Sequence, residues 1–140
     1  MQVREVMSPR PEILAADATI REAALKMREC ESGIMPIAKN DKLIGMLTDR
    51  DITIRAVAEG VSADQKVTDI LASEVLYCFE NDEVKSVLKN MHDQQVQRLV
   101  VLNNPEQKDL VGIVSVADIA DKCDDADSAR AIVECCRHYH

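Results

Sequence analysis

The chain has 140 residues, of which 46% are hydrophobic and 30% charged, the balance of an ordinary globular protein. Its 17 basic and 25 acidic residues give a formal net charge of −8, which disfavours binding to the phosphates of nucleic acids. No apolar run reaches the roughly 18 residues of a membrane span, and no apolar signal core follows the first residues, so we expect a cytoplasmic protein without a membrane partner. The five cysteines have no regular spacing, which fits a reducing compartment better than a disulfide framework.

The chain contains an internal repeat. Segment 3–7 (VREVM) is similar to segment 67–71 (VTDIL), at an offset of 64 residues. The same offset aligns two apolar quartets whose i, i+3, i+4, i+7 spacing predicts short amphipathic helices. The quartets are Ile20, Ala23, Ala24, Met27 and Val84, Val87, Leu88, Met91. Thr19 with Glu22 predicts a capping box at the start of the first helix, and Asp82 is a candidate cap for the second.

Each of these helices is followed by two short apolar runs that are bounded by turn-forming residues, and such runs predict buried strands. The runs are 35–38, 43–48, 99–102 and 110–115, and the first pair is joined by a tight hairpin at Asn40-Asp41. We expect a closing helix to start near Asp49 and another near Val116. Each copy therefore predicts the order strand, helix, strand, strand, helix.

The repeat suggests a division of the chain into residues 1–60, a linker at 61–65, residues 66–122 and a tail at 123–140. A unit of about 60 residues is marginal alone because one face of its sheet stays exposed, so we expect the two copies to bury those faces against each other. In the tail, residues 126–137 predict a last helix. Its expected apolar face contains Ala129, Ile132, Val133 and Cys136.

A local motif recurs where a buried strand turns into a closing helix. It reads Gly-apolar-x-Thr/Ser-x-x-Asp-Ile at 45–52 and again at 112–119. Helix capping is one explanation, because the hydroxyl accepts the N3 amide and the acid returns the bond. The functional alternative is a helix start that binds phosphate, beside an acid that accepts the vicinal hydroxyls of a ribose. The candidates are Thr48 with Asp51 and Ser115 with Asp118.

Taken together, these features resemble a tandem pair of cystathionine-β-synthase (CBS) domains, of the kind that occurs as small stand-alone bacterial proteins. The resemblance covers roughly residues 1–122 and is carried by REVM at 4–7, GIMPI at 33–37, LTDRDI at 47–52 and VGIVSVADI at 111–119. It implies an α/β fold of two β-α-β-β-α repeats packed through their sheets with pseudo-twofold symmetry, and a homodimer. It also implies clefts that bind an adenosyl ligand: AMP, ADP, ATP, S-adenosylmethionine or NAD.

The resemblance also implies roles for single residues. Asp51 and Asp118 would bind ribose hydroxyls, and the hydroxyls of the motif would lie near phosphate. Arg98 matches a basic residue that the family often has before its central strand, whereas Ile34 stands there in the first copy, where Arg50 is the substitute candidate. The implied nucleotide-binding residues are thus Thr48, Asp51, Ser115, Asp118, Arg98 and Arg50, and candidate walls for the adenine are Ile13, Leu14, Leu76 and Tyr77.

We therefore expect a regulatory module that senses an adenine nucleotide and acts on an unknown effector protein in trans. No general base or nucleophile is identifiable beyond the capping positions, so we expect no enzyme and no catalytic residue. One alternative is a ligand-free interaction module whose acids only cap helices. Another is a metal or redox sensor, since soft metal ligands gather in the tail and a distant cysteine pair could be either a redox couple or two buried thiols. The residues concerned are Cys135, Cys136, His138, His140, Cys30 and Cys78.

Overall fold

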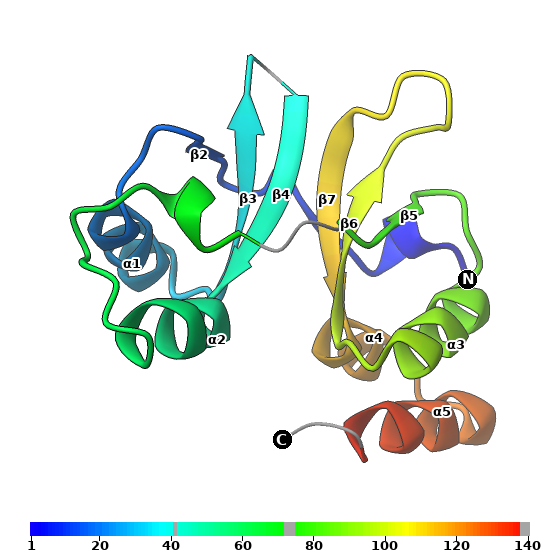
Figure 1. Cartoon of the computed structure of the whole chain (residues 1–140). Coiled ribbons are helices and arrows are strands. Elements are labelled where there is room, and N and C mark those ends of the chain that lie inside the picture. The colour runs from blue at the N-terminus through cyan, green and yellow to red at the C-terminus, as the bar shows by residue number, and fades with distance from the viewer. Residues whose placement is uncertain (41, 72–74, 138–140) are drawn as a thin grey trace. The chain divides into compact units, whose positions relative to one another are not determined.

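The computed structural model describes residues 1–40, 42–71 and 75–137, and it divides the chain into two compact units (Figure 1). Unit 1 consists of Met1–Pro11 and Leu76–His140, and unit 2 of Glu12–Val75. Unit 2 contains β2 (Leu14–Ala15), α1 (Ile20–Cys30), β3 (Ile34–Lys39), β4 (Lys42–Thr48) and α2 (Asp49–Asp51). Unit 1 contains β1 (Ser8–Pro9), β5 (Tyr77–Phe79), α3 (Val84–Gln94), β6 (Arg98–Leu102), β7 (Leu110–Ser115), α4 (Val116–Lys122) and α5 (Ala126–Cys136).

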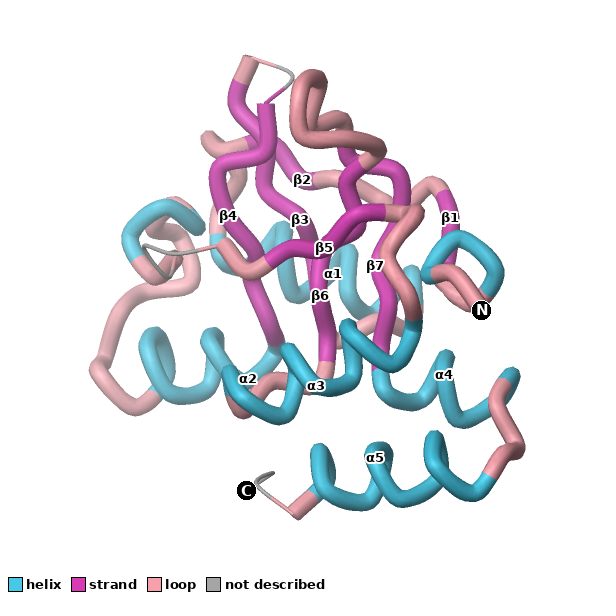
Figure 2. The backbone as a smooth tube through the Cα atoms, turned by 90° about the vertical axis from the view of Figure 1, so that its right-hand side faces the viewer, coloured by secondary structure: helices cyan, strands magenta, loops and turns pink. Residues whose placement is uncertain are grey.

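Each unit holds a small mixed sheet. In unit 2 the strand order is β2-β3-β4, with β2 parallel and β4 antiparallel to β3. In unit 1 the order is β1-β7-β6-β5, with β5 parallel to β6 and both other pairs antiparallel. The predicted α/β fold is therefore confirmed, and Figure 2 shows the strands and helices that build it. Lys39 pairs with Lys42, as the expected hairpin requires, although Asp41 of its turn lies outside the described residues.

The predicted amphipathic helices are present as α1 and α3. All four predicted residues of the α3 stripe are buried in the core of unit 1. In α1, Ile20, Ala23 and Met27 are buried in the core of unit 2, but the prediction is wrong for Ala24, which is exposed. Thr19 forms the expected capping box, because its Oγ1 accepts the Glu22 N–H at 3.1 Å. The expected cap of α3 is wrong: Glu83 is its N-cap, and the Asp82 carboxylate instead accepts the Phe79 N–H at 2.9 Å, which closes the turn after β5. No helix in the described ranges is long and apolar enough to cross a membrane.

The two copies of the repeat exchange their opening segments. Val3 lies in the core of unit 1, its N–H donates to the Asp82 carbonyl oxygen at 2.9 Å, and β1 pairs with β7. The corresponding Val67 lies in the core of unit 2, and its N–H donates to the Ala18 carbonyl oxygen at 2.9 Å. The units thus divide the chain differently from the repeat in the sequence, because each unit takes its opening segment from the other copy.

The tail forms α5, which packs on α3 and α4 of unit 1. The predicted apolar face is wrong by one residue, because Val133 is 52% exposed whereas Ser128 and Cys135 are buried. The predicted apolar face and the buried face, which contains Ser128 and Cys135, have the same helical spacing, so spacing alone could not choose between them. Polar contacts decide: Asp125 caps the Ser128 N–H at 3.0 Å, and the Cys135 thiol donates to the Leu88 carbonyl oxygen at 3.3 Å.

Candidate functional site

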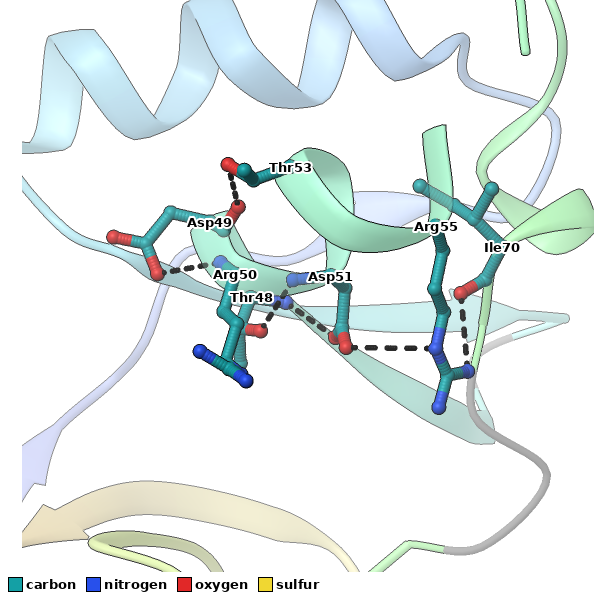
Figure 3. A network of polar contacts seen from close by, with 7 residues as sticks. All are labelled: Thr48, Asp49, Arg50, Asp51, Thr53, Arg55 and Ile70. Carbon is teal, nitrogen blue, oxygen red and sulfur yellow. Dashed lines mark hydrogen bonds and ion pairs between the residues drawn. The ribbon is translucent and has the colours of Figure 1, made fainter. Parts of the chain in front are cut away.

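The first candidate site lies where β4 of unit 2 ends and α2 begins (Figure 3). Thr48 is the N-cap of α2, and its Oγ1 accepts the Asp51 N–H at 3.1 Å. The Asp51 side chain returns the bond, since its Oδ2 accepts the Thr48 N–H at 2.9 Å. Both residues are half-buried. One carboxylate oxygen of Asp51 is therefore used by the backbone, and Oδ1 is the oxygen left for other partners.

The second candidate site repeats this geometry in unit 1, at the junction of β7 and α4. Ser115 Oγ accepts the Asp118 N–H at 3.0 Å, and Asp118 Oδ2 accepts the Ser115 N–H at 3.0 Å. Ser115 and Asp118 are half-buried, as in the first site. The structure thus brings each predicted hydroxyl together with its predicted acid, in a capping box that also serves the helix.

Basic residues distinguish the two sites. Arg98 begins β6, is exposed, and lies directly opposite Ser115 across the β6–β7 pair. The corresponding partner of Thr48 across β3–β4 is Ile34, which is buried. A cation therefore accompanies the second box from the neighbouring strand, but not the first. Arg50, the candidate substitute, is an exposed residue of α2 whose backbone N–H donates to Asp49 Oδ1 at 2.9 Å (Figure 3).

A further basic residue, not predicted as part of the site, lies beside Asp51. The chain continues from α2 into a π-helical segment, Ile52–Val57, a rare form that is frequent at functional sites. From this segment Arg55 places its Nε 3.9 Å from Asp51 Oδ1, and its Nη1 donates to the Ile70 carbonyl oxygen at 3.4 Å (Figure 3). The sequence held a signal for this pair, because an acid and a base four residues apart on a helix are neighbours.

Two of the predicted adenine walls are exposed at equivalent places of the two units. Ile13, just before β2, is 48% exposed, and Tyr77, the first residue of β5, is 40% exposed. The Tyr77 ring packs edge-on against Phe79, with ring centroids 5.6 Å apart. Both side chains are therefore accessible to solvent.

The cysteines lie in unlike environments. Cys78 is buried, and desolvation raises the pKa of its thiol to about 12, with a smaller contribution from Asp82. The expectation of two buried thiols is wrong for Cys30, which is exposed at the end of α1. Among the described residues no three His, Cys, Asp or Glu side chains are grouped to hold a metal ion. His138 and His140 of the candidate metal cluster lie outside the described residues.

Two curated relatives match most of the chain. The CBS domain-containing protein YhcV of Bacillus subtilis is 31% identical over 116 residues, which cover 83% of this chain and 81% of the relative. Hypoxic response protein 1 of Mycobacterium tuberculosis is 36% identical over 117 residues, covering 82% and 80%.

Two solved structures have similar folds. The crystal structure of a hypoxic response protein 1, with two coordinated zinc ions, is 32% identical, has a TM-score of 0.78, and is matched over 89% of this chain and 100% of its own. The CBS domain pair of protein MJ0100, in complex with 5′-methylthioadenosine and S-adenosylmethionine, is 26% identical, with a TM-score of 0.76 over 86% and 94% of the two chains.

The family model of the CBS domain matches this chain twice, over residues 3–57 and 67–125. The two matches contain the two capping boxes, and they end before α5. The matched residues make up well over half of the chain, and they fall on both copies of the repeat. The chain belongs to the CBS domain family.

Proposed function

We propose that the protein is a non-catalytic regulatory module that binds an adenosyl compound through one or both of its capping boxes. In this proposal Asp51 and Asp118 accept the hydroxyls of a ribose, while Thr48 and Ser115 lie near the phosphate or its replacement. Arg98 would contact a phosphate at the second site, and Arg50 at the first. The candidate ligands are AMP, ADP, ATP, S-adenosylmethionine and NAD.

The observation that carries the proposal is the recurrence of one polar arrangement in both units. Each box joins a hydroxyl, a carboxylate and backbone N–H groups at the start of a helix within hydrogen-bond distance, where β4 or β7 ends. Capping stabilises a helix with such a pair, but it uses only one of the two carboxylate oxygens. The second oxygen of each acid can accept ligand hydroxyls without breaking the cap. The adenosyl compounds bound by MJ0100, a member of the same family, support this class of ligand.

Regulation requires that the ligand favour one of two states of the protein. We propose that the chain forms a homodimer, and that ligand binding changes a surface that an effector protein recognises in trans. A ligand at saturation shifts the equilibrium between the two states by the ratio of its affinities for them, toward the state that it binds more tightly.

The test is a thermal-unfolding series of the full chain with AMP, ADP, ATP, S-adenosylmethionine, NAD and zinc. A ligand at 100 times its Kd adds about 2.7 kcal/mol to the free energy of unfolding, which is several degrees of Tm for a chain of this size. We expect a shift with at least one adenosyl compound. Asp51→Asn and Asp118→Asn should each abolish the part that comes from its own site, because Asn retains a capping oxygen but lacks the second acceptor.

The matched control is Glu22→Gln, because Glu22 completes the same kind of capping box at Thr19 on α1. It should leave every ligand shift unchanged. A ligand shift that survives the combined Asp51→Asn and Asp118→Asn changes would contradict the proposed site. If no adenosyl compound shifts Tm, the acids serve only as caps and the ligand-free interaction module becomes the better explanation. A shift with zinc alone would favour the metal sensor, for which the zinc-bound relative is the supporting observation.

A further inference from the structure

Arg55 contacts two residues of unit 2, Asp51 four positions before it and Ile70 fifteen positions after it. It lies in the π-helical segment after α2, with its Nε facing Asp51 Oδ1 at 3.9 Å. Its Nη1 donates to the Ile70 carbonyl oxygen at 3.4 Å, at the end of the 3-10 turn Val67–Asp69 (Figure 3). The guanidinium group therefore bridges the acid of the first box and the exchanged segment. A planar guanidinium with several fixed N–H groups suits such a double contact, whereas an ammonium does not.

The two contacts of Asp51 leave its outer oxygen usable. Oδ2 accepts the Thr48 N–H at 2.9 Å, a full hydrogen bond. Oδ1 stands 3.9 Å from the Arg55 Nε, an ion-pair distance that is too long for a hydrogen bond. The lone pairs of Oδ1 thus remain available to ligand hydroxyls. The nearby positive charge meanwhile fixes the rotation of a carboxylate whose side chain is only 21% exposed.

The anchor at Ile70 is rigid. Ile70 is 3% exposed and packs in the core of unit 2, and its own N–H donates to the Val67 carbonyl oxygen at 3.1 Å. A free arginine side chain loses conformational entropy when it pairs with an acid, and this loss offsets much of the electrostatic attraction. The bond to a buried carbonyl restricts that freedom, so Arg55 can hold Asp51 in one position.

The second unit offers a natural comparison. The offset of 67 that relates Thr48 to Ser115 and Asp51 to Asp118 places Lys122 at the position of Arg55. Lys122 is exposed at the end of α4, and within the described ranges it makes no ion pair with Asp118. Asp51 and Asp118 therefore share one capping geometry, but only Asp51 has an arginine beside its Oδ1 among the described ion pairs.

We propose that Arg55 is a positioning residue for Asp51 and makes the first site the tighter of the two adenosyl sites. The inference rests on the proposed function and concerns how that function is divided between the units. Asp51 is oriented before the ligand arrives, so binding at this site loses less side-chain entropy than binding at Asp118. The cation that Arg98 brings to the second site acts on a phosphate and does not orient the acid.

The test is isothermal titration calorimetry of the full chain with each of the five candidate compounds in turn: AMP, ADP, ATP, S-adenosylmethionine and NAD. The Asp118→Asn chain reports the first site and the Asp51→Asn chain the second. We expect the Asp118→Asn chain to bind more tightly. Adding Arg55→Gln to it should raise Kd by up to about fivefold, the upper end of what a partly exposed ion pair contributes. Arg55→Lys keeps the charge but not the second contact to Ile70, so its Kd should lie between those of its parent and of the Arg55→Gln chain. The matched control, Lys122→Gln in the Asp51→Asn chain, should leave Kd unchanged.

The possible outcomes distinguish a failure of the proposed function from a failure of the inference about Arg55. If the wild-type chain binds none of the five compounds, or binds after both acids are changed, the proposed function fails and the inference fails with it. If binding depends on Asp51 but Arg55→Gln binds like its parent, the inference alone is overturned. It is also overturned if Arg55→Lys is as weak as Arg55→Gln, since the role would then be structural. Thermal unfolding without ligand shows that each variant is folded before its titration.

Discussion

A Cβ atom on Gly112 would lie 2.7 Å from the Met7 sulfur and 2.9 Å from the Ser8 carbonyl oxygen. Gly112 is in β7, and the two atoms belong to the opening segment that pairs with it. In unit 2 the corresponding Gly45 faces Leu71, whose side-chain methyl carbons would lie 3.2 Å from such a Cβ. In each unit, the glycine of the repeated motif therefore contacts the opening segment that comes from the other copy of the repeat.

Gly112→Ala should destabilise the protein, because the added methyl group meets a backbone oxygen that cannot move without disturbing the β1–β7 pair. We expect a loss of about 1–3 kcal/mol in the free energy of unfolding, measured by urea denaturation. Gly45→Ala is the matched control and should cost less, since only the flexible end of Leu71 has to shift. Equal losses for the two variants would contradict this account of the contact.

The capping hydroxyls should contribute to stability whether or not a ligand binds. Thr48→Ala and Ser115→Ala each remove the oxygen that accepts the N3 amide, so each should lower the free energy of unfolding by about 1 kcal/mol. Thr48→Ser retains the hydroxyl and should cost much less. A ligand-free comparison by urea denaturation measures this, and a Thr48→Ala variant as stable as the wild type would contradict the capping geometry.

Local patterns in the sequence predicted the elements that depend on neighbours along the chain. The stripe that begins at Ile20 predicted α1, and the spacing of Thr48 and Asp51 predicted their mutual hydrogen bonds. The hydroxyl and acid of each site could be found in this way because a capping box is closed within four residues. Arg98 is assigned to the second site only through the family resemblance, and the strand register places it opposite Ser115.

Contacts between distant residues could not be predicted in this way. Nothing in the opening segment indicates that Val3 packs in the core with α3 rather than with the helix that follows it. The bond from Arg55 to Ile70 likewise joins residues fifteen positions apart, through a turn that has no sequence signal of its own. In α5 two stripes of equal spacing competed, and the buried one contains Ser128, a residue that hydropathy places outside.

The cap of α5 should make stability depend on pH in the acid range. Hydrogen bonds from Ser128, first from its side chain and then from its backbone N–H, lower the pKa of Asp125 below its ordinary 3.8. The unfolded chain therefore binds the proton more readily, so this contribution is complete above about pH 5 and is lost as pH falls through the lowered pKa.

The Asp125→Asn variant tests this contribution, with stability measured by urea denaturation at a series of pH values. The difference between the wild type and this variant should shrink as the solution is acidified below pH 3.8. The control Asp124→Asn removes a neighbouring charge and leaves the cap intact, so its difference from the wild type should change less. A difference for Asp125→Asn that grows on acidification would contradict the cap.

Thiol reactivity should separate the cysteines. Cys30 and Cys136 are exposed, whereas Cys78 is buried and has a pKa raised to about 12, so almost none of it is thiolate at neutral pH. We expect 5,5′-dithiobis(2-nitrobenzoic acid) to label the two exposed thiols of the native protein promptly, and Cys78 only after denaturation. Peptide mapping by mass spectrometry identifies the labelled residues, and Cys78→Ser should leave the fast phase unchanged. Prompt labelling of native Cys78 would contradict its burial.

The exchange of opening segments gives the two units a different order of assembly during synthesis. Unit 2 is one continuous stretch, Glu12–Val75, so all of its residues are available once that stretch has left the ribosome. Residues 1–11 are made before that stretch, yet β1 pairs with β7 and the Val3 N–H donates to the Asp82 carbonyl oxygen, and both of these partners are made after it. Val3 and Val6, two valines of the core of unit 1, therefore wait for their partners while unit 2 folds.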